Sequence, residues 1–181
     1  MTALDLLKRR IAASGPVTVA EFMRLALAEH GAGYYAMRDP LGSTGDFITA
    51  PEISQMFGEL IGLWCVDAWE RAGAPDPFLL VELGPGRGTL MADALRAAKV
   101  RPQLLSAMRL HLVEISRPLR EAQEHRLGAF HPLWHDDTTT LPDGPALIVG
   151  NEFLDALPIH QFQMTEQGWR ERAVDLGGEG L

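Results

Sequence analysis

The residues best suited to chemistry lie in one short stretch, in which an acid is followed by three glycines at alternate positions. Glu82 precedes Gly84, Gly86 and Gly88, and the apolar run 78–83 leads into them. Apolar residues then recur at helical spacing, which indicates a strand, a tight turn and a helix. A glycine turn lets the backbone approach a ligand closely, and a helix amino terminus offers free N–H groups. The sequence therefore predicts a nucleotide-type cofactor site at the carboxyl end of a strand.

The spacing of the glycines narrows the choice of cofactor. A dinucleotide fingerprint reads G-x-G-x-x-G, but here the third glycine comes one residue early and Thr89 takes the sixth position. The pattern E-x-G-x-G-x-G resembles the first motif of class I S-adenosylmethionine (SAM) methyltransferases. A carboxylate at Glu82 suits a cofactor that carries a sulfonium and an ammonium group. We expect Glu82, the three glycines and Thr89 to bind this cofactor. The alternative is a glycine-rich turn that binds no ligand.

Acids also follow the next two expected strands. The run 110–115 is typical of a buried strand, and Glu114 falls at its carboxyl end, where Rossmann and methyltransferase folds use an acid to bind the ribose hydroxyls. We expect its carboxylate to face a solvent-filled crevice and to matter little for folding; the alternative is an exposed strand-end acid. A short strand at 130–134 leads to Asp136, which either meets the adenine amino group or is a solvated or helix-capping acid. His135 has no second histidine at ligand spacing, so no metal site is predicted.

A third group of polar residues follows the apolar run 146–150, the fourth expected strand. Asn151, Glu152 and Asp155 leave its carboxyl end, where the switch-point rule places the substrate. Two carboxylates three residues apart, beside an amide, suit a cationic or amide nitrogen. The alternative is a turn with solvated acids.

The segment 34–50 is long and irregular, yet too apolar for simple disorder. It either folds over the site, which would bring Asp46 and Phe47 to the cofactor, or packs on the protein's own surface. Thr49 and Glu52 then form a capping box that opens a long helix. Apolar residues line one face of that helix: Ile53, Met56, Phe57, Leu60, Ile61 and Trp64.

Composition limits the classes of protein and partner. The 181 residues are 46% apolar with a net charge of -8, which predicts a globular domain without the basic surface of a nucleic-acid binder. Neither a membrane-length apolar run nor the core of a signal peptide is present. With Cys65 as the single cysteine, no internal disulfide can form, and we expect a cytoplasmic protein.

The remaining sequence suggests how the chain is organised. Capping signals at Thr2 and Thr18 open two helices before the first strand, and the stretch 159–176 has the pattern of a β-hairpin. We therefore expect residues 1–77 to form an N-terminal helical extension with the active-site loop. Residues 78–181 are expected to form the SAM-binding α/β core.

Three stretches together resemble one family. Residues 45–59, 81–91 and 150–158 are similar to the signature segments of the MidA-type SAM-dependent methyltransferases. The resemblance implies an α/β, Rossmann-like class I methyltransferase fold with SAM as cofactor. The family includes a mitochondrial complex I assembly factor that methylates a protein arginine. It therefore implies methyl transfer to an arginine nitrogen of a protein substrate, such as a respiratory complex subunit, with Asn151, Glu152 and Asp155 at the site of transfer.

One departure from the family pattern concerns length. Members of the family are much longer, and the sequence contains four core strands and a hairpin where the class I sheet has seven strands. We therefore expect an N-terminal half that lacks the C-terminal strands, with an uncovered sheet edge through which copies associate. Two alternatives to an enzyme of this kind are a non-catalytic SAM-binding assembly protein and a nicotinamide-dependent oxidoreductase, the latter disfavoured by the glycine spacing.

Overall fold

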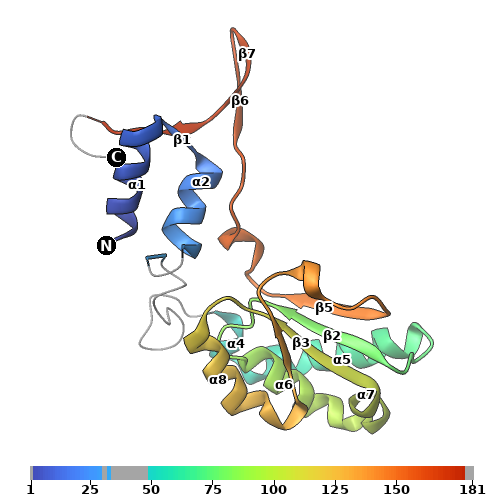
Figure 1. Cartoon of the computed structure of the whole chain (residues 1–181). Coiled ribbons are helices and arrows are strands. Elements are labelled where there is room, and N and C mark those ends of the chain that lie inside the picture. Colours follow the sequence, from blue (N-terminus) through green and yellow to red (C-terminus); the bar gives the residue numbers. More distant parts are fainter. Residues whose placement is uncertain (1, 30–31, 34–48, 178–181) are drawn as a thin grey trace. The chain divides into compact units, whose positions relative to one another are not determined.

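The computed structural model describes residues 2–29, 32–33 and 49–177 (Figure 1). It divides into two compact units. One comprises Asp39–Phe153, and the other combines Met1–Arg38 with Leu154–Leu181. This division differs from the boundary after residue 77 that the sequence suggested, because the C-terminal hairpin belongs with the N-terminal helices.

The first unit is built on a four-stranded parallel sheet. Its order is β4 (Leu133–His135), β3 (Met108–Val113), β2 (Phe78–Leu83) and β5 (Ala146–Gly150). The central strand β2 is nearly all apolar because it is buried on both faces. The α/β class and the four core strands are confirmed, although β4 starts three residues later than expected.

Helices cover one face of this sheet, and their side chains form the main core with Phe78 and Leu80 from β2 (Figure 1). A smaller apolar cluster on the other face contains Leu79, Val81 and Val113. The helical elements of the unit are α4 (Ala50–Ile53), α5 (Gln55–Arg71), α6 (Thr89–Ala97), η2 (Ala98–Val100), α7 (Pro102–Ala107), α8 (Arg117–Leu127), η3 (Gly128–Phe130) and η4 (Thr138–Thr140).

The predicted long helix from Thr49 is divided, which corrects the sequence interpretation. Ser54 adopts an extended conformation between α4 and α5, and the Thr49 side chain makes no capping hydrogen bond. The apolar face of α5 is also more exposed than a core-facing stripe: the exposed fractions of Met56, Leu60 and Trp64 are 54–64%. The buried face consists instead of Gly58, Gly62, Cys65 and Trp69.

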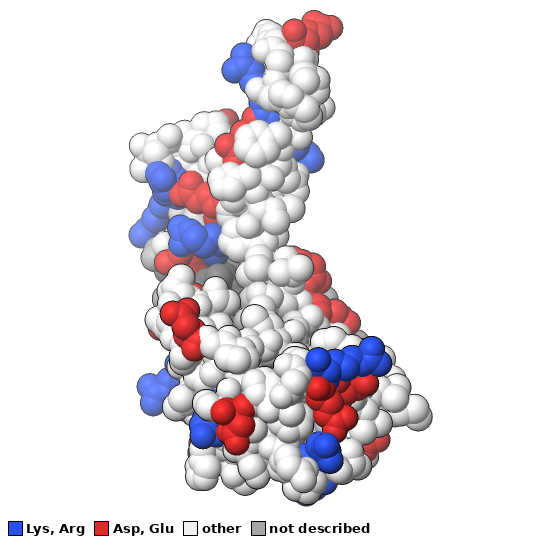
Figure 2. Space-filling view, turned by 90° about the vertical axis from the view of Figure 1, so that its right-hand side faces the viewer, with Lys and Arg blue, Asp and Glu red and all other residues white. Residues whose placement is uncertain are grey.

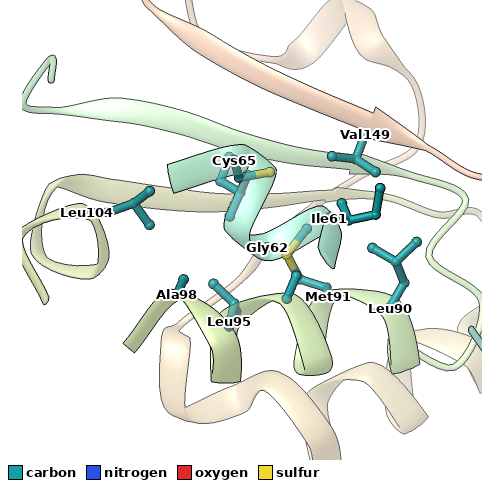
Figure 3. A pocket seen from close by; sticks show the side chains of 11 residues that line it. Ile61, Gly62, Cys65, Leu90, Met91, Leu95, Ala98, Leu104 and Val149 are labelled. Atoms are coloured by element: carbon teal, nitrogen blue, oxygen red, sulfur yellow. The ribbon is translucent and has the colours of Figure 1, made fainter. Parts of the chain in front are cut away.

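Small residues on α5 allow it to lie very close to α6. A Cβ atom added to Gly62 would lie 2.2 Å from the carbonyl oxygen of Ala94, and one added to Gly58 would lie 2.6 Å from the Cβ of Asp93. Figure 3 shows Gly62 facing the α6 side chains beneath the sheet. The cavity beside it measures only about 10 Å³, roughly the space of one water, and its lining is apolar. A larger residue at Gly58 or Gly62 would therefore clash with α6.

The second unit joins the two ends of the chain. Val17 in β1 (Val17–Thr18) pairs in antiparallel fashion with β8 (Ala173–Val174), and Leu7, Ile11 and Val17 belong to one small apolar core. The capping box of Thr2 is confirmed. The other elements are α1 (Ala3–Ser14), α2 (Val19–Met23), the π-helical η1 (Arg24–Ala28), η5 (Leu154–Ala156) and the predicted hairpin of β6 (Phe162–Thr165) and β7 (Gly168–Glu171).

Charges are mixed on the surface. On the face shown in Figure 2, Lys and Arg side chains lie next to Asp and Glu side chains rather than forming a continuous basic area. None of the helices in the described part of the chain has the length and apolar character needed to cross a membrane.

The contact between α5 and α6 gives a first prediction. Gly62→Ala should lower the free energy of unfolding by about 1–3 kcal/mol, the usual effect of overpacking, although alanine has the higher helix propensity. Chemical denaturation followed by circular dichroism would measure this change. Unchanged or increased stability would contradict the close approach of Gly62 to Ala94.

Candidate functional site

The four parallel strands bring the predicted polar residues to one edge of the sheet. Leu83 is in register with Val113 and with Gly150, and Val113 is in register with His135. All four strands run in the same direction, so the segments that follow them emerge together. The glycine turn, Glu114, Asp136 and the Asn151–Glu152 pair therefore share the carboxyl edge, where ligands bind in open α/β sheets.

The glycine turn needs its glycines. Gly84, Gly86 and Gly88 have φ values of 61°, 55° and 76°, in the left-handed region that other residues rarely adopt. The ring of Phe153 packs against the turn, because a Cβ atom on Gly84 would lie 2.6 Å from its Cδ2. Phe153 was not among the predicted residues. The φ values and the packing of Phe153 therefore require glycine at Gly84.

Thr89 begins α6, but its hydroxyl group is engaged by the protein. It donates to Oε1 of Glu52 at 2.5 Å and accepts from Arg126 of α8. Glu52 therefore bonds Thr89 across 37 residues instead of closing a capping box with Thr49. This contact ties α4 to the start of the helix that follows the glycine turn.

Glu114 lies at the predicted place, but the expectation of a carboxylate that faces a solvent-filled crevice is wrong, and so is the alternative of an exposed strand-end acid. Only 8% of the residue is exposed. Oε1 accepts from the Ser116 N–H at 2.8 Å, and Oε2 accepts from Nε2 of Gln123 at 3.4 Å. Burial raises the pKa of the carboxyl above its ordinary value, while the bonds from Ser116 and Gln123 act in the opposite direction.

Glu82 is the more deeply buried acid. It is 2% exposed, and its Oε2 has no hydrogen-bond partner among the described residues. It follows Phe78 and Leu80 on the face of β2 that packs against the helices, so burial raises its pKa to about 8. The pKa of the neighbouring Cys65 thiol rises to about 11, first through burial and second through Glu82.

Arg120 of α8, which the sequence did not single out, connects the ends of β3 and β4. Its guanidinium donates to the carbonyl oxygen of Glu114, to that of His135 at 3.1 Å, and to Oδ1 of Asp136 at 2.6 Å. Asp136 is otherwise exposed, with 82% of its side chain accessible. Arg120 thus holds Asp136 close to the end of β3, where Glu114 lies.

Two of the residues predicted for methyl transfer, Asn151 and Glu152, lie at the carboxyl edge of the sheet. Asn151 and Glu152 follow β5 at the carboxyl edge, and Glu152 has a φ of 48°, a strained value for a non-glycine residue. Asp155 lies in η5, which belongs to the other unit. Asp46 and Phe47 lie outside the described residues.

A hollow of the described part of the α/β unit lies away from the carboxyl edge. A cavity of about 390 Å³ opens at the amino ends of β3 and β4, lined by Arg109, His131 and Leu133 among others. This end of the sheet carries none of the acids discussed above. Its size alone does not make it the cofactor site.

The comparisons with known proteins agree with the geometry of the carboxyl edge. A family model described as an S-adenosyl-L-methionine-dependent methyltransferase matches residues 60–180. The mitochondrial protein arginine methyltransferase NDUFAF7 of Mus musculus is 44% identical over 191 residues, 92% of this chain. The Homo sapiens protein of the same name is 43% identical over 194 residues, again 92% of this chain.

The chain belongs to the MidA-type SAM-dependent methyltransferase family.

A solved member of the same structural class supports this assignment. A Burkholderia thailandensis protein bound to S-adenosyl-homocysteine superimposes with a TM-score of 0.79 at 29% identity, and the match covers 98% of this chain and 47% of that one. The chain spans 44% of the mouse relative and 43% of the human relative. It thus corresponds to a little under half of the length of these MidA-type proteins.

The carboxyl edge fits the cofactor of the MidA-type family. The buried Oε2 of Glu82, at the end of the strand that leads into the glycine turn, is an acceptor without a partner in the described part of the chain. Glu114 retains acceptor capacity, because its two carboxylate oxygens offer about four lone pairs and the contacts from Ile115, Ser116 and Gln123 use three of them. A cofactor with cationic groups and vicinal hydroxyls would satisfy these atoms.

The buried Glu82 predicts a pH dependence of stability. The pKa of Glu82 is about 8 in the folded chain and 4.5 ordinarily. The contribution of its protonated form to the stability of the folded chain is fully present below pH 4.5. This contribution is lost as the pH rises through about 8, because the unfolded chain ionises first. Between these values, Glu82→Gln should gain stability relative to the wild type by about 1.4 kcal/mol per pH unit. Denaturation at pH 5, 6, 7 and 8 would give the slope.

An exposed acid provides the control for this slope. Glu166→Gln, in the turn of the hairpin, should show a difference from the wild type that does not grow across the same range. A flat difference for Glu82→Gln as well would mean that Glu82 is ionised in the folded chain.

Proposed function

We propose that this chain is the cofactor-binding part of a SAM-dependent methyltransferase that acts on a protein arginine nitrogen. The observation that carries the proposal is the shared carboxyl edge, where a glycine turn meets two buried acids, Glu82 and Glu114. The alignment with the S-adenosyl-homocysteine complex and the names of the NDUFAF7 relatives support it. The chain covers less than half of the length of those relatives.

Each residue of the edge has a proposed role. Glu114 accepts hydrogen bonds from the ribose hydroxyls, and Asp136 accepts one from the adenine amino group. Gly84, Gly86 and Gly88 let the backbone contact the cofactor, with Thr89 holding the start of α6 against Glu52. Glu82 balances the positive charge of the ammonium group, which would favour its ionised form.

Asn151, Glu152 and Asp155 are proposed to bind the substrate. When bound, SAM supplies a methyl group on a sulfonium, so the acceptor nitrogen gains the methyl, the sulfonium becomes a thioether and the nitrogen releases a proton. Carboxylates bind a guanidinium with paired hydrogen bonds and hold it in line. Such positioning provides a large part of the rate of a reaction between two bound groups.

The natural substrate is proposed to be a protein, with a respiratory complex subunit as the class to test first. The support is the name of the relatives in Xenopus tropicalis and Danio rerio, mitochondrial protein arginine methyltransferase. The cytoplasmic location expected from the sequence stays a prediction.

The acidic pair tests the catalytic part of the proposal. Glu152→Gln combined with Asp155→Asn should leave S-adenosyl-homocysteine affinity within about twofold and lower arginine methylation by about 100-fold or more, because a misplaced acceptor loses that much rate. Calorimetry would measure binding, and transfer of a labelled methyl group to arginine-containing protein would measure activity.

The double variant Glu166→Gln with Asp143→Asn, at two exposed acids, is the matched control for the loss of two negative charges. If the double variant loses cofactor affinity, these acids belong to the cofactor pocket. If the wild-type chain binds the cofactor but transfers no methyl group, the chain is a non-catalytic SAM-binding protein.

The free edge of the sheet carries a separate proposal, that copies of this chain associate. Among the described strands β5 forms one border of the sheet, and its Ile148 is 55% exposed. Unpaired strand edges with apolar side chains promote pairing between chains. Sedimentation should show association that increases with concentration and is weakened by Ile148→Lys. Val100→Lys replaces another exposed apolar residue and should not weaken it; a monomer at all concentrations would contradict the proposal.

A further inference from the structure

The fully buried side chain of Gln123 lies at the junction of three parts of the cofactor site. Its Nε2 donates to the carbonyl oxygen of Gly86 at 2.7 Å and to Oε2 of Glu114 at 3.4 Å. Its Oε1 accepts from the indole Nε1 of Trp134 at 2.8 Å. The exposed fraction of Gln123 is 0%.

The orientation of this amide follows from its partners. A carbonyl and a carboxylate only accept hydrogen bonds, and an indole N–H only donates. The nitrogen of Gln123 must therefore face Gly86 and Glu114, and its oxygen must face Trp134. Both amide hydrogens and the amide oxygen have partners, so the side chain is fixed in one position.

We propose that Gln123 is a positioning residue of the cofactor site, whose amide holds the glycine turn and the Glu114 carboxylate in place for the adenosine part of SAM. The inference rests on the ribose-binding role proposed for Glu114. It adds a residue that touches no reacting atom and acts through two groups that do contact the cofactor.

The glycine turn gains most from being held. Glycine has more conformational freedom than other residues, so a turn with three glycines is easily disordered. A site that must be ordered during binding loses affinity. The bond from Gln123 to Gly86 fixes the middle of the turn before the cofactor arrives.

The same amide favours the ionised form of Glu114, which accepts hydrogen bonds but cannot donate them. Several other groups surround this carboxyl. Ser116 offers its N–H from the start of α8, Arg120 of α8 contributes a positive charge, and His135 and Asp136 lie at the end of β4 with Asp136 paired to Arg120. Because burial already raises the pKa of Glu114, removing the Gln123 donor should raise it further.

The test is the affinity for S-adenosyl-homocysteine measured by calorimetry from pH 5 to 8. Gln123→Met keeps the size of the side chain but removes both donors. We expect about tenfold weaker binding at pH 7, equivalent to ~1.4 kcal/mol. The pH below which affinity falls should also move upward, since Glu114 must be ionised to accept both ribose hydroxyls. Nuclear magnetic resonance of the Glu114 carboxyl carbon in the ligand-free chain should give a higher pKa in the variant.

Two further variants separate this role from a purely structural one. Trp134→Phe removes the third partner of Gln123 but leaves both donor bonds, so it should leave the pH profile unmoved even if it lowers the melting temperature. Glu114→Gln should bind weakly and lose the Glu114 part of the pH dependence. If Gln123→Met does not fold, the double variant with Trp134→Phe removes the unpaired indole donor and serves in its place.

The outcomes distinguish this inference from the function on which it rests. Wild-type affinity and an unmoved profile in Gln123→Met, with weak binding by Glu114→Gln, overturn the positioning role alone. Wild-type binding by Glu114→Gln overturns the ribose role and the positioning role with it. No binding by the wild-type chain overturns the proposed function.

Discussion

The parallel pairing of β2 with β3 on one side and β5 on the other is the constraint on which the site depends. It places the ends of these strands in register, so the turn after Leu83 lies between the residues after Val113 and those after Gly150. A slip of one residue would turn every side chain of β2 to the opposite face and would expose Phe78 and Leu80. Core packing therefore fixes the strand register, and the register fixes the positions of the site residues that follow the strands.

Helix α8 supplies the second level of organisation. Along one face it presents Arg120 to the ends of β3 and β4, Gln123 to the glycine turn, and Leu127 to the space beneath Gly88. A Cβ atom on Gly88 would lie 3.1 Å from Cδ1 of Leu127, and the φ of 76° at Gly88 also disfavours other residue types. Contacts from α8 thus hold the strand ends and the glycine turn of the carboxyl edge in place.

The sequence predicted the parts of this framework that depend on local pattern. The apolar run before Gly84 and the acid Glu114 at the end of the next strand could both be placed, because strand and turn signals extend over only a few residues. The burial of Glu114 could not be predicted in the same way, since it comes from Ser116 and Gln123 closing around the carboxylate. The one available signal for Gln123 was its position between Leu119 and Leu127 on the buried stripe of the helix, where a polar residue requires a partner.

Contacts between distant segments account for most of the remaining differences. Glu52 was expected to cap its own helix, yet it bonds the hydroxyl of Thr89, which lies 37 residues away. The pairing of Val17 with Val174 likewise joins the two ends of the chain, and no local pattern in two-residue strands announces it. The need for glycine in α5 could not be predicted either, because it follows from the contact between Gly62 and Ala94 of another helix.

The most direct test of this account is a calorimetric titration of the purified 181-residue chain with S-adenosyl-homocysteine, run beside the variant Gly86→Val. The account predicts one binding site per chain for the wild type and no measurable heat for the variant, because valine cannot adopt the φ of 55° without strain and its side chain would fill the turn. Equal binding by the two folded proteins would contradict the assignment of the glycine turn, and no binding by a folded wild type would contradict the cofactor site as a whole.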